Sequence, residues 1–125
     1  MPHIDIEYSS NLQQVVDSTR MVDVIHQAAL ATGAFPRWGV RTFAKAIERF
    51  RIGECEVDNG LIRIIVRISP GRDLAVKQAI ARSLFDAACG MLEPLYCEKR
   101  VGCQLEIQEF EAALSLARYQ LPGSP

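Results

Sequence analysis

Pro2 is the residue of this sequence that could do chemistry without a side-chain functional group. The initiator Met is usually removed when a small residue such as Pro follows it, which would leave Pro2 as a terminal secondary amine. A free α-amino group titrates near ~7.7–8.0, and burial in an apolar pocket lowers its pKa because burial disfavours the charged form. Such an amine is a general base at neutral pH. Proline makes up about 5% of residues in proteins, so an ordinary structural role for Pro2 stays open.

Two arginines closely follow glycines, where backbone freedom can orient a long side chain. Arg41 lies two residues after Gly39, and Arg72 comes directly after Gly71. Two guanidinium groups and one neutral amine would suit a di- or tricarboxylate substrate from which a proton must be moved. The alternative is that both arginines are solvated surface residues or are paired with nearby acids. Those acids are Asp73, Glu48 and Glu54.

Phe35 and Trp38 flank the loop that leads to Arg41. Their side chains would either wall a pocket beside this arginine or take part in ordinary packing, and the sequence favours neither interpretation. With Pro2, Arg41 and Arg72 they complete the set of candidate site residues.

Metal and thiol chemistry have weaker support. His3, Asp5 and Glu7 alternate along one segment and could in principle bind a metal ion, but a solvated polar strand face explains them more simply. The cysteines show no CxxC spacing, which disfavours a zinc or thioredoxin-like site. They are Cys55, Cys89, Cys97 and Cys103. We therefore predict no metal site, and we find no phosphate-binding glycine loop and no nucleophile elbow.

The composition indicates one globular domain spanning residues 1–125, with 49% hydrophobic and 23% charged residues. A net charge of −1 argues against a nucleic-acid partner, because phosphate binding needs a basic surface. No apolar run approaches the ~20 residues of a membrane span. A strand that starts at residue 3 leaves no room for a signal peptide, so we expect a cytoplasmic protein with reduced thiols.

The first half of the chain shows one strand, one helix and one ambiguous segment. Ile4, Ile6 and Tyr8 alternate with polar residues, which predicts a half-buried strand. Helical spacing begins near residue 18 and should end at Gly33. Residues 39–51 fit a helix by spacing, but they precede a hairpin-like turn at residues 57–60 whose Asn-Gly pair is a strong hairpin signal. We therefore favour a strand there, followed by a hairpin.

The second half begins with an Ile- and Val-rich strand at residues 61–68. Asp73 is a suitable N-cap for a long helix that should end before Pro94. Apolar residues then alternate over residues 101–108 and predict the last strand, while residues 111–125 would form a short helix and a frayed tail.

This order predicts an α+β fold made of two β-α-β units, at about residues 1–55 and 56–115. Such units form a four-stranded sheet with both helices on one face. Because Ile- and Val-rich strands should not leave the other face exposed to water, we expect oligomerisation through the sheets.

Five short motifs, in this order and at these separations, resemble the 5-carboxymethyl-2-hydroxymuconate Δ-isomerase family of the tautomerase superfamily. They are MPH (1–3), ATGAFP (31–36), GVR (39–41), GR (71–72) and LEI (105–107). The resemblance covers essentially the whole chain.

The resemblance implies a tautomerase-like homotrimer with active sites near the subunit interfaces. It implies that Pro2 is the catalytic amine and that Arg41 and Arg72 bind substrate carboxylates. It also favours an extended conformation for residues 39–51. The chain departs from the family at Arg37-Trp38 and in the acidic loop of residues 52–60, and either departure could change which substrate is accepted.

The function that we expect from the resemblance is a 1,3-allylic proton shift in 5-carboxymethyl-2-hydroxymuconate. This isomerase reaction belongs to homoprotocatechuate breakdown in aromatic compound catabolism, and it needs neither a metal nor an organic cofactor. One alternative is a tautomerase-superfamily enzyme that acts on another unsaturated oxo or hydroxy acid. Another is a trimer that binds an anionic ligand without turnover.

Overall fold

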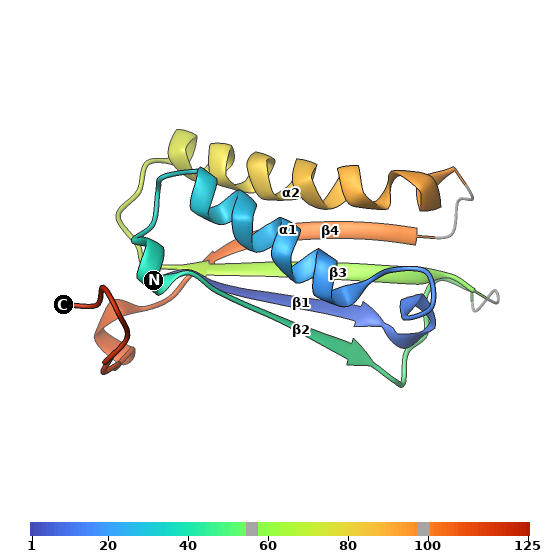
Figure 1. Cartoon of the computed structure of the whole chain (residues 1–125), viewed down its shortest axis with the longest axis horizontal. Coiled ribbons are helices and arrows are strands. Elements are labelled where there is room, and N and C mark those ends of the chain that lie inside the picture. The colour runs from blue at the N-terminus through green and yellow to red at the C-terminus, as the bar shows by residue number, and fades with distance from the viewer. Residues whose placement is uncertain (55–57, 98–100) are drawn as a thin grey trace.

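The computed structural model describes residues 1–54, 58–97 and 101–125. In this part of the chain, two α-helices cover one face of a four-stranded sheet (Figure 1). The elements are β1 (His3–Ser9), α1 (Ser18–Ala31), β2 (Arg41–Ile47), β3 (Gly60–Ile68), α2 (Leu74–Tyr96) and β4 (Val101–Glu109). Short 3₁₀ turns occur at Ser10–Leu12, Arg37–Gly39 and Ala112–Leu114. None of the described helices has the length and apolar character that a membrane span requires.

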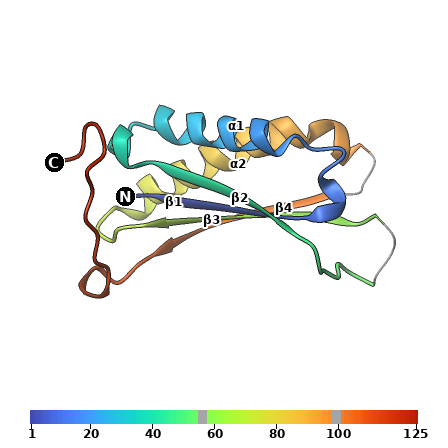
Figure 2. The same ribbon diagram turned by 60° about the horizontal axis from the view of Figure 1, so that its bottom comes forward.

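The strand order β2-β1-β3-β4 confirms the predicted pair of β-α-β units. Strands β1 and β2 are parallel, as are β3 and β4, and the two units meet through the antiparallel pair β1 and β3. Both helices lie on the same side of the sheet in both views (Figures 1 and 2). The predicted α+β fold is therefore correct.

The predicted hairpin between β2 and β3 is wrong, although β2 itself is a strand as we favoured. The crossover through α1 places β2 on one side of β1, and β3 pairs with the other side. β1 therefore separates the two strands that the Asn59-Gly60 turn was expected to join. Residues 55–57 of the segment between them, including Cys55, lie outside the described part of the chain.

The prediction that the second helix ends before Pro94 is also wrong. α2 includes Pro94 and continues to Tyr96. A proline inside a helix removes one backbone hydrogen bond, but Leu95 and Tyr96 pack partly buried against the core. Because only the last turn follows Pro94, this packing offsets the lost bond.

The core lies between the sheet and the helices. Alternation along β1 and β3 directs one set of aliphatic side chains toward α1 and α2, where they are fully or almost fully buried. They are Ile4, Ile6, Ile62, Ile64, Val66 and Ile68. Leu61 and Ile65 of β3 alternate to the other face and are half-buried.

The open face of the sheet is more polar than expected from its Ile- and Val-rich strands, because those residues point mainly to the helix side. Two cross-strand ion pairs lie on this face, Glu7 with Arg63 at 2.9 Å and Asp5 with Arg67 at 3.8 Å. Phe43 of β2 is nevertheless 61% exposed.

The predicted frayed tail is wrong as well. After the 3₁₀ turn at Ala112–Leu114, the chain runs across the end of the sheet at which it began (Figure 2). It is held there by Tyr119, whose ring packs edge-on against Trp38 with a centroid separation of 5.2 Å. The carboxyl-terminal segment thus belongs to the same end of the molecule as Pro2.

Candidate active site

Pro2 lies at the amino-terminal end of β1 and is fully buried. Its carbonyl oxygen accepts a hydrogen bond of 3.3 Å from the backbone N–H of Arg41. The parallel ladder continues from this bond, with His3 opposite Arg41. Strand pairing therefore places Pro2 and Arg41 side by side although they are far apart in the sequence.

The chain terminus lies in a partly buried and positively charged environment. The chain described here retains Met1, whose α-amine is 3.5 Å from the hydroxyl oxygen of Ser69. Burial, followed by the charges of Arg72 and Arg41, lowers the pKa of this amine below its ordinary value. The Met1 side chain packs on Gly39, where an added Cβ would lie 2.5 Å from the Met1 sulfur. Gly39 thus leaves room for a group at the terminus.

Arg41 opens β2 and is held from two sides. Its Nη2 donates to Nε2 of His3 at 2.8 Å, and its guanidinium lies 4.9 Å from the centroid of the Tyr119 ring. Its Nε is buried and has no hydrogen-bond partner within the described residues. A buried donor without a partner is costly, so the Nε of Arg41 would gain free energy from an acceptor.

His3 is neutral in this arrangement. Burial is the main cause that lowers its pKa, followed by the charges of Arg41 and Arg67. Because a guanidinium can only donate, Nε2 of His3 must accept, which assigns the ring proton to Nδ1. His3 therefore orients Arg41 as a neutral acceptor.

Arg72 is fixed by the two loops that lead to β2 and α2. Its Nη2 donates to the carbonyl of Ala34 at 3.1 Å, and its Nη1 donates to that of Ser69 at 3.4 Å. Gly71 has a φ of 116°, a conformation that favours glycine and turns the chain just before this arginine. The guanidinium lies 5.0 Å from the centroid of Phe35.

The alternative of ordinary ion pairs does not describe either candidate arginine. Within residues 1–54, 58–97 and 101–125, no acidic side chain lies within 4.0 Å of the guanidinium groups of Arg41 and Arg72. Their contacts are instead a neutral histidine, backbone carbonyls and aromatic rings. Both positive charges therefore remain available to an anion.

The structure brings all five candidate residues to one end of the sheet. Phe35 is 7% exposed and packs directly on Arg72. Tyr119 links Trp38 to Arg41 because it contacts both. Whether the two aromatic residues line a substrate pocket stays a prediction.

Tyr119, Ser69 and the role of His3 were missed by sequence reasoning. The chain's own tail supplies Tyr119, and nothing local in residues 111–125 signals a contact with Trp38. His3 was considered only as a metal ligand, although it follows Pro2 directly in the sequence. A parallel alignment of the first two strands would have placed it opposite Arg41.

Other candidate sites lack convergent reactive groups. His3, Asp5 and Glu7 each contact an arginine, and the described residues contain no cluster of three or more His, Cys, Asp or Glu side chains that could hold a metal ion. Burial raises the pKa of Cys103 to about 11, so this thiol stays protonated at neutral pH. Cys89, Cys97 and Cys103 are free thiols.

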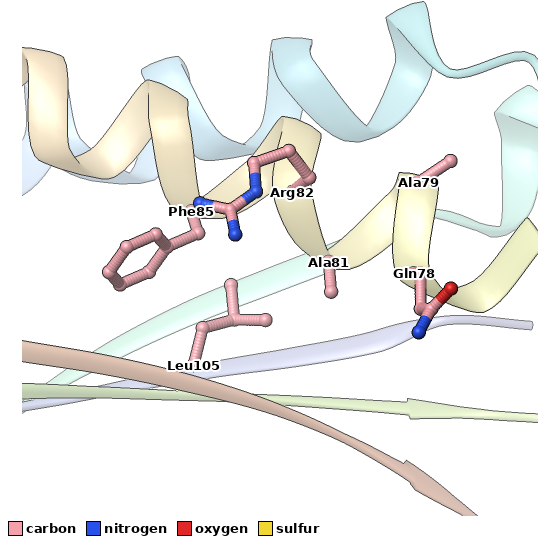
Figure 3. A pocket seen from close by; sticks show the side chains of 6 residues that line it. All are labelled: Gln78, Ala79, Ala81, Arg82, Phe85 and Leu105. Carbon is pink, nitrogen blue, oxygen red and sulfur yellow. The ribbon is translucent and has the colours of Figure 1, made fainter. Parts of the chain in front are cut away.

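A cavity of about 580 Å³ lies elsewhere, between α2 and β4 (Figure 3). Its lining residues are Gln78, Ala79, Ala81, Arg82, Phe85 and Leu105, none of which is a candidate site residue. Arg82, the one charged residue among them, is 73% exposed and lies 3.5 Å from Asp86. This cavity offers no set of converging charges.

Known proteins resemble this chain over nearly its whole length. A family model described as 5-carboxymethyl-2-hydroxymuconate isomerase matches residues 2–121. A 5-carboxymethyl-2-hydroxymuconate Delta-isomerase of Escherichia coli is 24% identical over 115 residues, which are 92% of this chain and 91% of that protein. The family resemblance seen in the sequence is confirmed.

Solved structures agree with these matches. A crystal structure of a 5-carboxymethyl-2-hydroxymuconate delta-isomerase has a TM-score of 0.87 and 27% identity, and the match covers 96% of this chain and 89% of that one. A 5-carboxymethyl-2-hydroxymuconate isomerase from Deinococcus radiodurans R1 has a TM-score of 0.89 and 21% identity, and the match covers 95% of this chain and 90% of that one. A fused 4-OT symmetric trimer has a TM-score of 0.62 and 17% identity, covering 92% and 94%, and shares the fold.

The contact between His3 and Arg41 predicts that the pKa of His3 depends on Arg41. His3 should titrate below ~6.5, and Arg41→Ala should raise its pKa because the substitution removes one of the charges that oppose protonation. NMR can follow both histidines, with His26→Gln identifying their signals and the exposed Arg20→Ala as control. An unchanged His3 titration in Arg41→Ala would contradict the contact.

Proposed function

We propose a specific reaction for this chain, which belongs to the 5-carboxymethyl-2-hydroxymuconate isomerase family and is an isomerase. The reaction is an enol-to-oxo tautomerisation that converts the dienol 5-carboxymethyl-2-hydroxymuconate to its conjugated 2-oxo isomer. The observation that carries the proposal is the convergence of the chain terminus, Arg41 and Arg72 at one end of the sheet.

The proton carrier in this proposal is the amine of Pro2. Removal of Met1 would turn the Pro2 nitrogen from an amide into a secondary amine at the end of a buried strand. The burial and the two arginines that lower the pKa of the Met1 amine would act on the Pro2 amine in the same sense. The neutral amine takes the proton of the 2-hydroxyl group, and its conjugate acid returns a proton to a carbon further along the conjugated chain. The O–H bond broken is balanced by the C–H bond formed, so no cofactor is needed.

The two arginines bind carboxylates and stabilise developing charge. Arg41 offers its unpartnered Nε together with a guanidinium that His3 and Tyr119 orient. Arg72 is held by two carbonyl groups and a ring, so its orientation does not depend on the substrate. One of them would also stabilise negative charge on the 2-oxo group as the hydroxyl loses its proton.

A second candidate substrate class is another unsaturated oxo or hydroxy acid. The observation that favours it is the Trp38–Tyr119 pair beside Arg41. Trp38 is one of the residues by which we expect this chain to differ from the family. This pair adds bulk next to the carboxylate site. Such a substrate would be processed by the same amine and arginines.

We also propose that the chain works as a homotrimer in the cytoplasm, with active sites near the subunit interfaces. Support comes from the symmetric trimer among its fold neighbours. Large apolar side chains outside the core support it too, since Phe43, Leu114 and Leu116 are 61%, 84% and 96% exposed.

The free thiols of the described residues are consistent with the cytoplasm as the compartment. In that compartment the reaction would serve homoprotocatechuate breakdown.

The amine mechanism predicts that a free Pro2 is essential. Chain lacking Met1, verified by intact mass, should ketonise 5-carboxymethyl-2-hydroxymuconate in an ultraviolet assay. Its kcat/KM should rise with pH along one ionisation somewhat below ~7.7, because the amine must lose its proton to act as a base. One residue added before Pro2 makes an amide and should abolish turnover, and Pro2→Ala should reduce it strongly.

Proteolytic removal of the added residue is the matched control, and it should restore turnover in the same preparation. A blocked terminus that turned over the dienol at the normal rate would end this mechanism.

The arginine roles predict graded losses. Arg41→Ala or Arg72→Ala should lower kcat/KM by about ten- to a hundredfold, the effect expected when a charge-assisted hydrogen bond of roughly 1.5–3 kcal/mol is lost. The exposed Arg20→Ala should keep full activity, and circular dichroism should show all three variants folded. Unchanged kinetics in both site variants would make these arginines simple surface residues.

The trimer predicts a mass of three chains of 13.9 kDa by light scattering at micromolar concentration. The exposed side chains of Phe43, Leu114 and Leu116 would drive assembly, because their burial removes apolar surface from water. A monodisperse monomer that retained isomerase activity would refute both the assembly and the placement of the sites at its interfaces.

A further inference from the structure

The carboxyl-terminal segment of residues 115–125 is attached to the active-site end of the molecule at two points. Tyr119 packs on Trp38 with an angle of 64° between the ring planes. Further on, a turn closed by hydrogen bonds between Leu121 and Ser124 brings Gly123 against the Trp38 side chain, where an added Cβ would lie 3.3 Å away. Figure 2 shows the segment crossing beside the amino terminus.

Trp38 anchors this segment, because the residues that precede Tyr119 are exposed. Leu114 and Leu116 are 84% and 96% exposed. Tyr119, in contrast, is half-buried between Trp38 and the guanidinium of Arg41, 4.9 Å from its ring centroid. Tyr119 is thus the side chain by which this segment contacts Arg41.

Arg41 and Arg72 each lie over an aromatic ring, but the two rings come from different parts of the protein. Arg72 stacks on Phe35, a buried core residue, and donates to two carbonyl groups. Arg41 has one hydrogen bond to His3 and an unpartnered Nε. The Tyr119 ring must therefore contribute more to the orientation of Arg41 than Phe35 does to that of Arg72.

We propose that residues 115–125 form a clamp in which Trp38 holds Tyr119 and Tyr119 holds Arg41 in the orientation that binds a substrate carboxylate. Tyr119 is then a positioning residue, and Trp38 acts through it. The clamp rests on the proposed function in one respect, namely that Arg41 binds the substrate.

Docking of the clamp can be measured without turnover, because Trp38 is the only tryptophan in the chain. Tyr119→Leu, or truncation after Arg118, should make Trp38 fluorescence more accessible to acrylamide. Tyr119→Phe keeps the ring and should behave as wild type, as should Gln120→Ala, which changes the exposed neighbour. Equal quenching in wild type, Tyr119→Leu and the truncated chain would overturn the clamp.

Positioning through Arg41 is tested by kinetics on 5-carboxymethyl-2-hydroxymuconate with Met1 removed. Tyr119→Leu should lower kcat/KM by about 3- to 30-fold, the range that follows from a cation–π contact. Tyr119→Phe and Gln120→Ala should remain close to wild type. A fall with Tyr119→Phe as large as that with Tyr119→Leu would assign the effect to the hydroxyl group and overturn positioning by the ring.

A double-mutant cycle separates positioning from a general structural effect. In the Arg41→Ala background, Tyr119→Leu should cause no further loss, whereas in the Arg72→Ala background it should cause its full loss. An equal loss in both backgrounds would overturn positioning through Arg41. A wild-type chain that did not turn over the dienol would refute the proposed function, and the quenching result would then decide the clamp by itself.

Discussion

The parallel pairing of β1 with β2 is the constraint on which the site depends. It begins with the hydrogen bond between the Pro2 carbonyl and the Arg41 N–H, and it continues with His3 opposite Arg41. A register shift of one residue in β1 would turn each of its side chains to the opposite face of the sheet. Ile4 and Ile6 would then leave the core, and the partners of Arg41 would change. The burial of these two side chains therefore stabilises the register that also sets the site.

The site gathers positive charge around the chain terminus, and the protein offsets the cost without acidic partners. Neutral acceptors and aromatic faces hold the two arginines, namely His3 and Tyr119 for Arg41, and backbone carbonyls and Phe35 for Arg72. An acidic partner would neutralise the charge that an anionic substrate needs. Neutral partners keep that charge and orient it. Burial, together with these same charges, lowers the pKa of the terminal amine. In the proposed mechanism the residues that bind the anion therefore also keep the base neutral.

The sheet divides its two faces between stability and surface chemistry. Aliphatic residues of β1 and β3 are buried under the helices, while the open face carries arginine–carboxylate pairs. Exposed ion pairs of this kind contribute little stability. The most exposed large apolar residues lie instead on β2, at the start of α2 and in the carboxyl-terminal segment.

Local pattern in the sequence determined the elements, because strand alternation, helical spacing and capping residues act between near neighbours in the chain. Residues 3–8 and 61–68, and the helix that ends shortly before Gly33, could be read in this way. The family motifs, read as a resemblance, pointed to Pro2, Arg41 and Arg72 before any geometry was known. Pro94 was misjudged because its local effect is outweighed by the packing of Leu95 and Tyr96.

Only the tertiary structure decided which segments meet. It placed β1 between β2 and β3, where the Asn-Gly turn had suggested a hairpin, because pairing depends on distant backbone groups. It also brought Tyr119 to Trp38 and Arg41. Contacts between residues so far apart leave no periodic trace in the sequence, since their stability comes from a neighbour that the folded chain supplies.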